Sequence, residues 1–175
     1  TSDGAMVVSS VEDPITFYKD GQGYNAGGIL FTKEKAKFSV AKGGDTKDAM
    51  AMLIDQKKDL WFGTKKGLYR INYDLYSDLE KLKGSTTMEG VKVSDETPGM
   101  PFNAVSVIEQ GKNGHLWVHG SKFSGPIKFE YKGISEFDGT EWKNYPVTGF
   151  EKEQINAIAL DGNDSPVVVI DVDML

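Results

Sequence analysis

The chain has no cysteine and only one arginine, Arg70, among its 175 residues. Without cysteine it has no disulfide framework, no thiolate nucleophile and no cysteine-ligated metal. With a single arginine, planar bidentate recognition of phosphates is not a theme of its surface. Long apolar runs are also missing, since none reaches the roughly 18 residues of a membrane span. We therefore expect no membrane insertion in this segment.

Basic residues are outnumbered by acidic ones, 20 against 26, which gives a formal net charge of −6. A nucleic-acid partner normally requires a basic stripe, so this balance argues against one. The sequence starts with Thr1 and not with methionine. We expect a mature form from which an export signal has been removed, and hence a periplasmic or extracellular location.

What the chain does contain is a repeat. Residues 49–64, 103–119 and 155–169 each show an apolar run, a polar turn and a second apolar run. The first two copies carry Leu-Trp near the start of the second run. With a further apolar run near residue 5, the copies recur at a period of about 40 to 50 residues, which is typical of β-propeller blades. First strands that are apolar on both faces are expected where one sheet stacks on the next.

We therefore predict an all-β fold of four-stranded, β-propeller-type blades. The single domain, 1–175, holds about three and a half repeats and forms a partial propeller or arc. The predicted repeat units cover about 5–48, 49–102, 103–154 and 155–175.

Local signals give further expectations. Residues 28–40 are interpreted as a hairpin that turns near Lys33, and Asp138-Gly139 as a tight hairpin turn. Pro146 lacks an N–H group, so the strand before it should lie at a sheet edge. Residues 74–84 are interpreted as a helical turn or as a fourth strand, and a strand is also predicted at 91–93.

The stretches Asp59-Leu-Trp-Phe-Gly-Thr-Lys-Lys-Gly-Leu-Tyr-Arg70 and Gly99-Met-Pro-Phe-Asn-Ala-Val105 resemble the two-component regulator propeller repeat family, as does Phe137-Asp-Gly139. The resemblance covers roughly residues 27 to 170. It implies a bacterial sensor propeller in signal transduction, of the kind found in the periplasmic half of hybrid two-component systems. Two departures are His119-Gly120, where the family pattern has Gly-Thr, and Pro166-Val-Val, where it has Leu-Trp. Family propellers usually have six to eight blades, so the missing blades belong to a longer chain or the ring closes by association.

Several side-chain groups have both a structural and a functional interpretation. His115 and His119 share one strand face and could ligate a metal, but structural packing is the favoured interpretation. Asp161–Ser165 has oxygen ligands at close spacing, yet its pattern fits a turn better than a calcium loop. Asp171 and Asp173 are interpreted as solvated, and the glycines of 21–28 as a plain loop. Trp61, Trp117 and Trp142 are interpreted as packing residues.

In propellers, ligands commonly meet the loops at one mouth of the central channel. We place that mouth at loops 41–48, 64–67, 94–103, 119–126 and 148–155. We predict no catalytic residue, no metal and no cofactor. The candidate ligand-binding residues in or near these loops are Tyr24, Lys65, Phe102, Asn103, His119, Lys122 and Phe123.

Three functions stay open at this point. The first is a non-catalytic, exported sensor or ligand-binding module for a small molecule or oligosaccharide, the sugar being an analogy to sensors of polysaccharide degradation. The second is an interaction scaffold, completed as a homo-oligomer or by another partner. The third is an enzyme resembling the streptogramin lyase propellers, for which His119 is the support.

Overall fold

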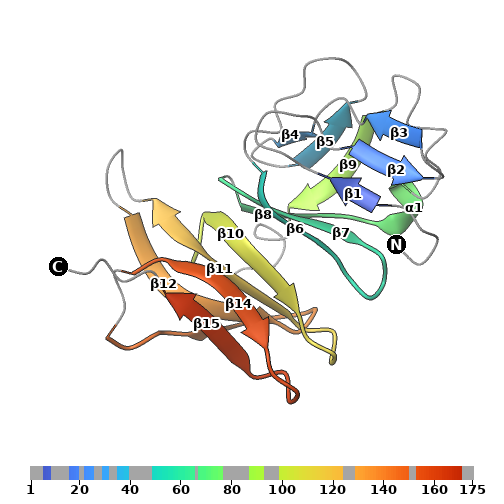
Figure 1. The fold of residues 1–175 in the computed structure, drawn as a ribbon. Coiled ribbons are helices and arrows are strands. Elements are labelled where there is room, and N and C mark those ends of the chain that lie inside the picture. The colour runs from blue at the N-terminus through green and yellow to red at the C-terminus, as the bar shows by residue number, and fades with distance from the viewer. Residues whose placement is uncertain are drawn as a thin grey trace.

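The computed structural model is all-β, built from antiparallel sheets with one four-residue helix in the described part (Figure 1). The structure describes residues 6–8, 16–19, 22–25, 29–31, 35–39, 49–65, 67–76, 87–92, 99–123, 129–149 and 153–170. Within these ranges no helix is long and apolar enough to cross a membrane.

The strands of the first half of the chain are β1 (Met6–Val8), β2 (Thr16–Lys19), β3 (Gln22–Asn25), β4 (Ile29–Phe31), β5 (Lys35–Ser39), β6 (Ala49–Ile54), β7 (Leu60–Thr64), β8 (Gly67–Ile71) and β9 (Thr87–Lys92). The helix α1 (Tyr73–Tyr76) lies between β8 and β9. The second half contains β10 (Ala104–Gln110), β11 (Leu116–Phe123), β12 (Phe129–Phe137), β13 (Trp142–Tyr145), β14 (Ile155–Leu160) and β15 (Pro166–Ile170).

The second repeat unit forms β6 to β9, but its sheet extends beyond one blade. The order is β4-β5-β9-β8-β7-β6, because β5 pairs with the outer strand β9. The hairpin predicted over 28–40 is confirmed as β4 and β5. Of the two interpretations of 74–84, the helical turn occurs as α1 at its start, and residues 77–86 lie outside the described part. The strand predicted at 91–93 overlaps β9, which starts earlier, at Thr87. The first unit is divided: β1, β2 and β3 form a separate three-stranded sheet.

The third repeat unit is the complete blade-like sheet. Its strands follow chain order, β10-β11-β12-β13, and all pair antiparallel. β13 ends one residue before Pro146 and lies at the sheet edge, as predicted. The β12–β13 turn contains Gly139 at φ 104°, a backbone conformation that glycine adopts without steric cost. The fourth unit has two strands in the described part, β14 and β15.

The three predicted repeat copies are structurally equivalent, as their turns show. In each turn the first residue donates its N–H to the carbonyl four residues later: Asp55 to Asp59, Gly111 to His115 and Asp161 to Ser165. The fourth turn residue has positive φ in all three, at Lys58, Gly114 and Asp164. The first strand of each pair also has its register shift at the matching place. These matches give a position-by-position alignment of the units.

Two apolar cores lie between successive sheets. The first joins the second and third units and includes Trp61, Leu68, Val105, Leu116 and Val118. The second joins the third and fourth units and includes the buried residues Trp117, Ile134, Ile155 and Ile158. The equivalent Trp61 and Trp117 are 3% and 5% exposed, which confirms their packing role. Each sheet thus buries an apolar face of the next sheet, which that sheet could not bury by itself. This arrangement is compatible with partial propeller-like blades.

Candidate functional site

Of the seven predicted site residues, those whose side chains the structure describes differ in their exposure to solvent. Lys65 and Lys122 are exposed, as is Asn103, whose N–H donates to the carbonyl of Ser121 at 3.2 Å. Tyr24 lies in β3 and Phe123 in β11, and their side chains lie outside the described part. Phe102 and His119 are buried and are brought together as an edge-to-face pair.

His119 is fully buried, and both its ring nitrogens have partners. Nδ1–H donates to the carbonyl of Gly133 at 2.7 Å, and Nε2 accepts the backbone N–H of Ile155 at 3.2 Å. Burial lowers its pKa, although the bond to Gly133 acts in the opposite direction. The ring therefore ties β12 to the first strand of the next unit, and its geometry leaves no nitrogen for proton transfer to a substrate.

His115 has a separate partner, so the two histidines do not converge on one site. Its Nδ1 lies 2.7 Å from Oε1 of Glu136, whose Oε2 accepts a hydrogen bond from the Tyr145 hydroxyl at 2.6 Å. Burial would raise the pKa of Glu136, but the hydrogen bonds from His115 and Tyr145 outweigh it and lower that pKa. No group of three His, Asp or Glu side chains in the described ranges is arranged to hold a metal.

The Asp161–Ser165 segment is a turn, as its favoured interpretation predicted. Oδ1 of Asp161 accepts the N–H groups of Asn163 and Ser165 at 2.8 and 2.9 Å. Asp171 and Asp173 lie outside the described residues, as do Gly21 and 26–28 of the glycine-rich segment.

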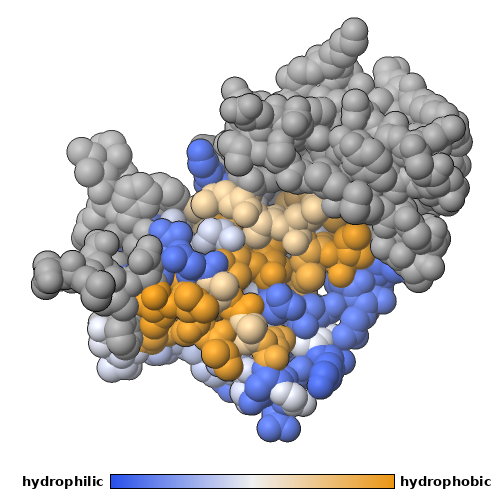
Figure 2. All heavy atoms as spheres, in the orientation of Figure 1, coloured by the Kyte–Doolittle hydropathy of each residue, from blue (hydrophilic) through white to orange (hydrophobic). Residues whose placement is uncertain are grey.

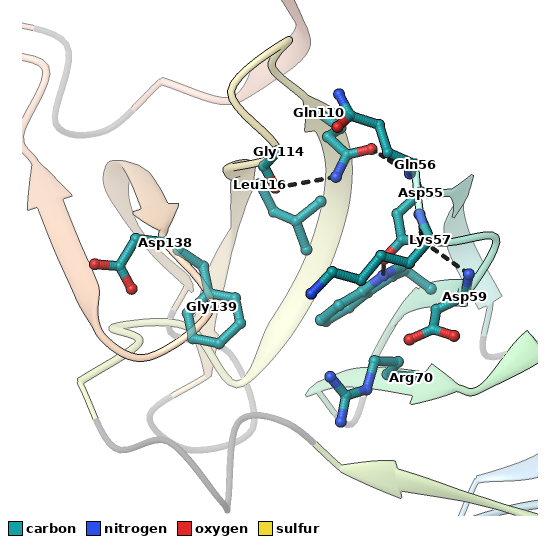
Figure 3. Close-up of a pocket in the computed structure, with 12 residues that line it drawn as sticks. Asp55, Gln56, Lys57, Asp59, Arg70, Gln110, Gly114, Leu116, Asp138 and Gly139 are labelled. Carbon is teal, nitrogen blue, oxygen red and sulfur yellow. Dashed lines mark hydrogen bonds between the residues drawn. The ribbon is translucent and has the colours of Figure 1, made fainter.

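A cavity of about 160 Å³ lies where the second and third units meet (Figure 3). Its walls come from the β6–β7 turn, from β8, and from the β10–β11 and β12–β13 turns. The lining residues are Asp55, Gln56, Lys57, Asp59, Trp61, Arg70, Gln110, Gly114, Leu116, Phe137, Asp138 and Gly139.

This cavity lies at the opposite ends of the strands from the loops predicted as the mouth. Successive antiparallel strands put the β6–β7, β10–β11 and β12–β13 turns at one edge and the predicted loops at the other. None of the seven predicted residues lines it. The sequence did contain a signal for this edge, because the three equivalent turns fall at matching repeat positions.

Asp55 organises the first wall of the cavity. Its Oδ1 accepts the N–H groups of Lys57 and Asp59, both at 2.8 Å. Its Oδ2 accepts the indole N–H of Trp61 at 2.8 Å. Both carboxylate oxygens are therefore used inside the protein, and the indole is held in one orientation against the neighbouring sheet.

Arg70 extends from β8 toward the cavity and lies over the Trp61 ring, with Cζ 5.6 Å from the ring centroid. A guanidinium over an indole face is attracted by the ring quadrupole. Its Nε is buried and has no hydrogen-bond acceptor among the described residues. The guanidinium is thus positioned mainly by the aromatic ring.

The opposite wall is the β12–β13 turn. Oδ1 of Asp138 accepts the Thr140 hydroxyl and N–H, both at 2.7 Å, and the Glu141 N–H at 2.9 Å. These bonds, the Thr140 hydroxyl first, lower the pKa of Asp138 to about 2. Asp138 is therefore a carboxylate across the physiological pH range.

Hydrogen bonds join the equivalent turns to one another. Gln56 donates its backbone N–H to Oε1 of Gln110 at 2.8 Å and its side-chain amide to the Gly111 carbonyl at 3.0 Å. On the next unit, the carboxylate of Asp164 accepts the N–H groups of Lys112 and Asn113 at 2.9 and 3.0 Å. The cavity wall is consequently formed before any ligand arrives.

Comparison of the chain with protein-family models and with curated proteins found no match.

Proposed function

We propose that the chain is a non-catalytic ligand-binding module of an exported bacterial sensor, located in the periplasm or outside the cell. The observation that carries the proposal is the preformed cavity between the second and third units. Its aromatic floor and its convergent polar groups are the combination typical of small-molecule sites. The resemblance to two-component regulator propellers supports a role in signal transduction.

The size of the cavity limits the ligand. At about 160 Å³ it is smaller than the roughly 300–1,000 Å³ of drug-sized sites. One sugar unit, as a free monosaccharide or as the end of an oligosaccharide, suits this volume. The cavity lining also suits a sugar. Its carboxylates and amides can accept hydrogen bonds from sugar hydroxyl groups, and its indole and phenyl rings can pack against the C–H groups of a sugar ring.

Thermal unfolding against a panel of mono- and oligosaccharides and small metabolites tests this function. A ligand that binds only the folded state stabilises it by RT ln(1+[L]/Kd), about 2.7 kcal/mol at a hundredfold excess over Kd. We expect the midpoint to rise with one sugar class. The variant Lys57→Gln, in the cavity, should reduce that rise, while Lys143→Gln, on exposed β13, should preserve it. No rise with any member of the panel would contradict the proposal.

A second candidate function, association with a second copy of this chain, rests on a different observation. Val167 and Val169 on β15 are both 58% exposed. They are equivalent to Trp61 and Gly63 in the second unit and to Trp117 and His119 in the third. In both those units, these positions contact the next sheet. Figure 2 shows hydrophobic residues gathered over β14 and β15 on the viewer's side.

A second copy fits this surface because the exposed positions of β14 and β15 that share it are uncharged. They are Ala157, Ala159, Val167 and Val169. Two chains with a net charge of −6 can approach through such a face without placing like charges opposite each other. β15 also pairs only with β14 among the described strands, whereas its equivalents β7 and β11 each have two neighbours.

A further inference from the structure

We propose that the ligand of the cavity between the second and third units is an acidic sugar, whose carboxylate binds Arg70 and Lys57. This inference rests on the proposed ligand-binding function and specifies its ligand. It depends on how the five charged side chains of the cavity are used within the protein.

The two cations of the cavity are available for a ligand. No ion pair or hydrogen bond within the described part of the chain engages the guanidinium of Arg70 or the ammonium of Lys57. In Figure 3 both groups point toward the space next to Leu116 and Gly139, in the cavity that Trp61 also lines. The guanidinium is a planar fork that matches a carboxylate with two parallel hydrogen bonds. Arg70 is the only residue in the chain with this geometry.

The three carboxylates of the cavity are already neutralised in part by the protein. Both oxygens of Asp55 accept protein N–H groups. Oδ1 of Asp138 accepts three hydrogen bonds, and Oδ1 of Asp59 accepts the N–H of Tyr73 at 2.9 Å. The remaining oxygens, Oδ2 of Asp59 and Oδ2 of Asp138, can accept hydroxyl protons from a ligand.

The combination therefore selects a molecule with one carboxylate and several hydroxyl groups. A neutral sugar would leave the guanidinium without an anionic partner in a partly buried place. A simple fatty acid would leave the outward carboxylate oxygens without donors. A sugar acid gives the two cations an anionic partner and gives the outward carboxylate oxygens hydroxyl donors. Its ring provides C–H groups for the apolar floor formed by Trp61 and Phe137.

Isothermal titration with three matched pairs tests this inference: D-glucuronate and D-glucose, D-galacturonate and D-galactose, and D-gluconate and D-glucitol. We expect at least one acid to bind at least tenfold more tightly than its neutral counterpart. Arg70→Gln should weaken binding of that acid at least tenfold. Arg70→Lys should restore part of it, because an ammonium keeps the charge but loses the fork. Lys143→Gln serves as the control, and circular dichroism checks that each variant is folded.

The outcomes separate this inference from the function on which it rests. Tighter binding of the acid that depends on Arg70 supports both. If neutral sugars bind as well as the acids and Arg70→Gln binds them unchanged, the acidic ligand is wrong and the binding function remains. If none of the six compounds binds, the acidic ligand is wrong; no response across the wider thermal panel would then contradict the binding function also.

Discussion

At the scale of single residues, the equivalent positions Gly63 and His119 both contact the first strand of the next unit, but in different ways. Gly63 in the second unit lets the neighbouring strand come so close that an added Cβ would meet the Val105 carbonyl oxygen at 2.5 Å. At the matching place, His119 reaches the next strand through a ring nitrogen. The sequence showed this exchange as a departure from a family pattern, but it did not show that both residues serve the contact between sheets.

The variant Gly63→Ala should lower the free energy of unfolding by about 1–3 kcal/mol, the usual cost of overpacking. The cost arises because the atom in the way belongs to the backbone of β10, which cannot rotate aside. Urea denaturation measures it. Gly162→Ala is the matched control, since a Cβ added at Gly162 would have nothing within 4 Å. Equal stability of the two variants would contradict the close approach of these sheets.

His119 should make the folded state sensitive to mild acid. Its folded pKa lies below the ordinary value of 6.5, so the unfolded chain takes up the proton first as the pH falls. Stability from this group is therefore complete above about pH 6.5 and declines as the pH falls toward the folded pKa. His119→Gln should show a smaller loss of stability than the natural chain between about pH 7 and pH 5. Identical losses in urea denaturation at the two pH values would count against this role.

At the scale of elements, sequence reasoning found what local pattern determines. The strand pairs β6–β7, β10–β11 and β14–β15 were predicted from apolar runs around a polar turn. So were the β4–β5 hairpin and the edge position of β13 beside Pro146. Each of these follows from period-two patterning or from turn chemistry within a few residues.

The pairing of β5 with β9 could not be predicted in this way. It joins residues 35–39 to 87–92, and nothing in either stretch specifies the other. The same limit applies to the candidate site. Arg70, Asp55 and Asp138 come from three different elements, and they meet only because two sheets stack with their turns at one edge. Loop position alone favoured the other edge, where Phe102 and His119 proved to be core residues.

At the scale of the whole molecule, the second, third and fourth units stack in series, and both contacts between them use equivalent positions. The second unit contacts the third through Trp61 and Gly63, and the third contacts the fourth through Trp117 and His119. The same positions of the fourth unit, Val167 and Val169, are exposed. In a repeat architecture stability depends on each interface between neighbours, so this face is the natural place for association.

The variant Val169→Lys should abolish association while leaving the single chain folded. Its side chain points away from the packed core, and exposed substitutions usually change stability by no more than about 0.5 kcal/mol. Val168, one residue earlier on the opposite face, packs against the core that includes Ile155 and Ile158. The variant Val168→Lys should therefore unfold the fourth unit, because it places a charge in that core. Light scattering over a range of concentrations reports the mass, and thermal unfolding reports the fold. If the natural chain stays monomeric at every concentration, association with a second copy is wrong. The exposed valines would then be tolerated by the monomer without a partner.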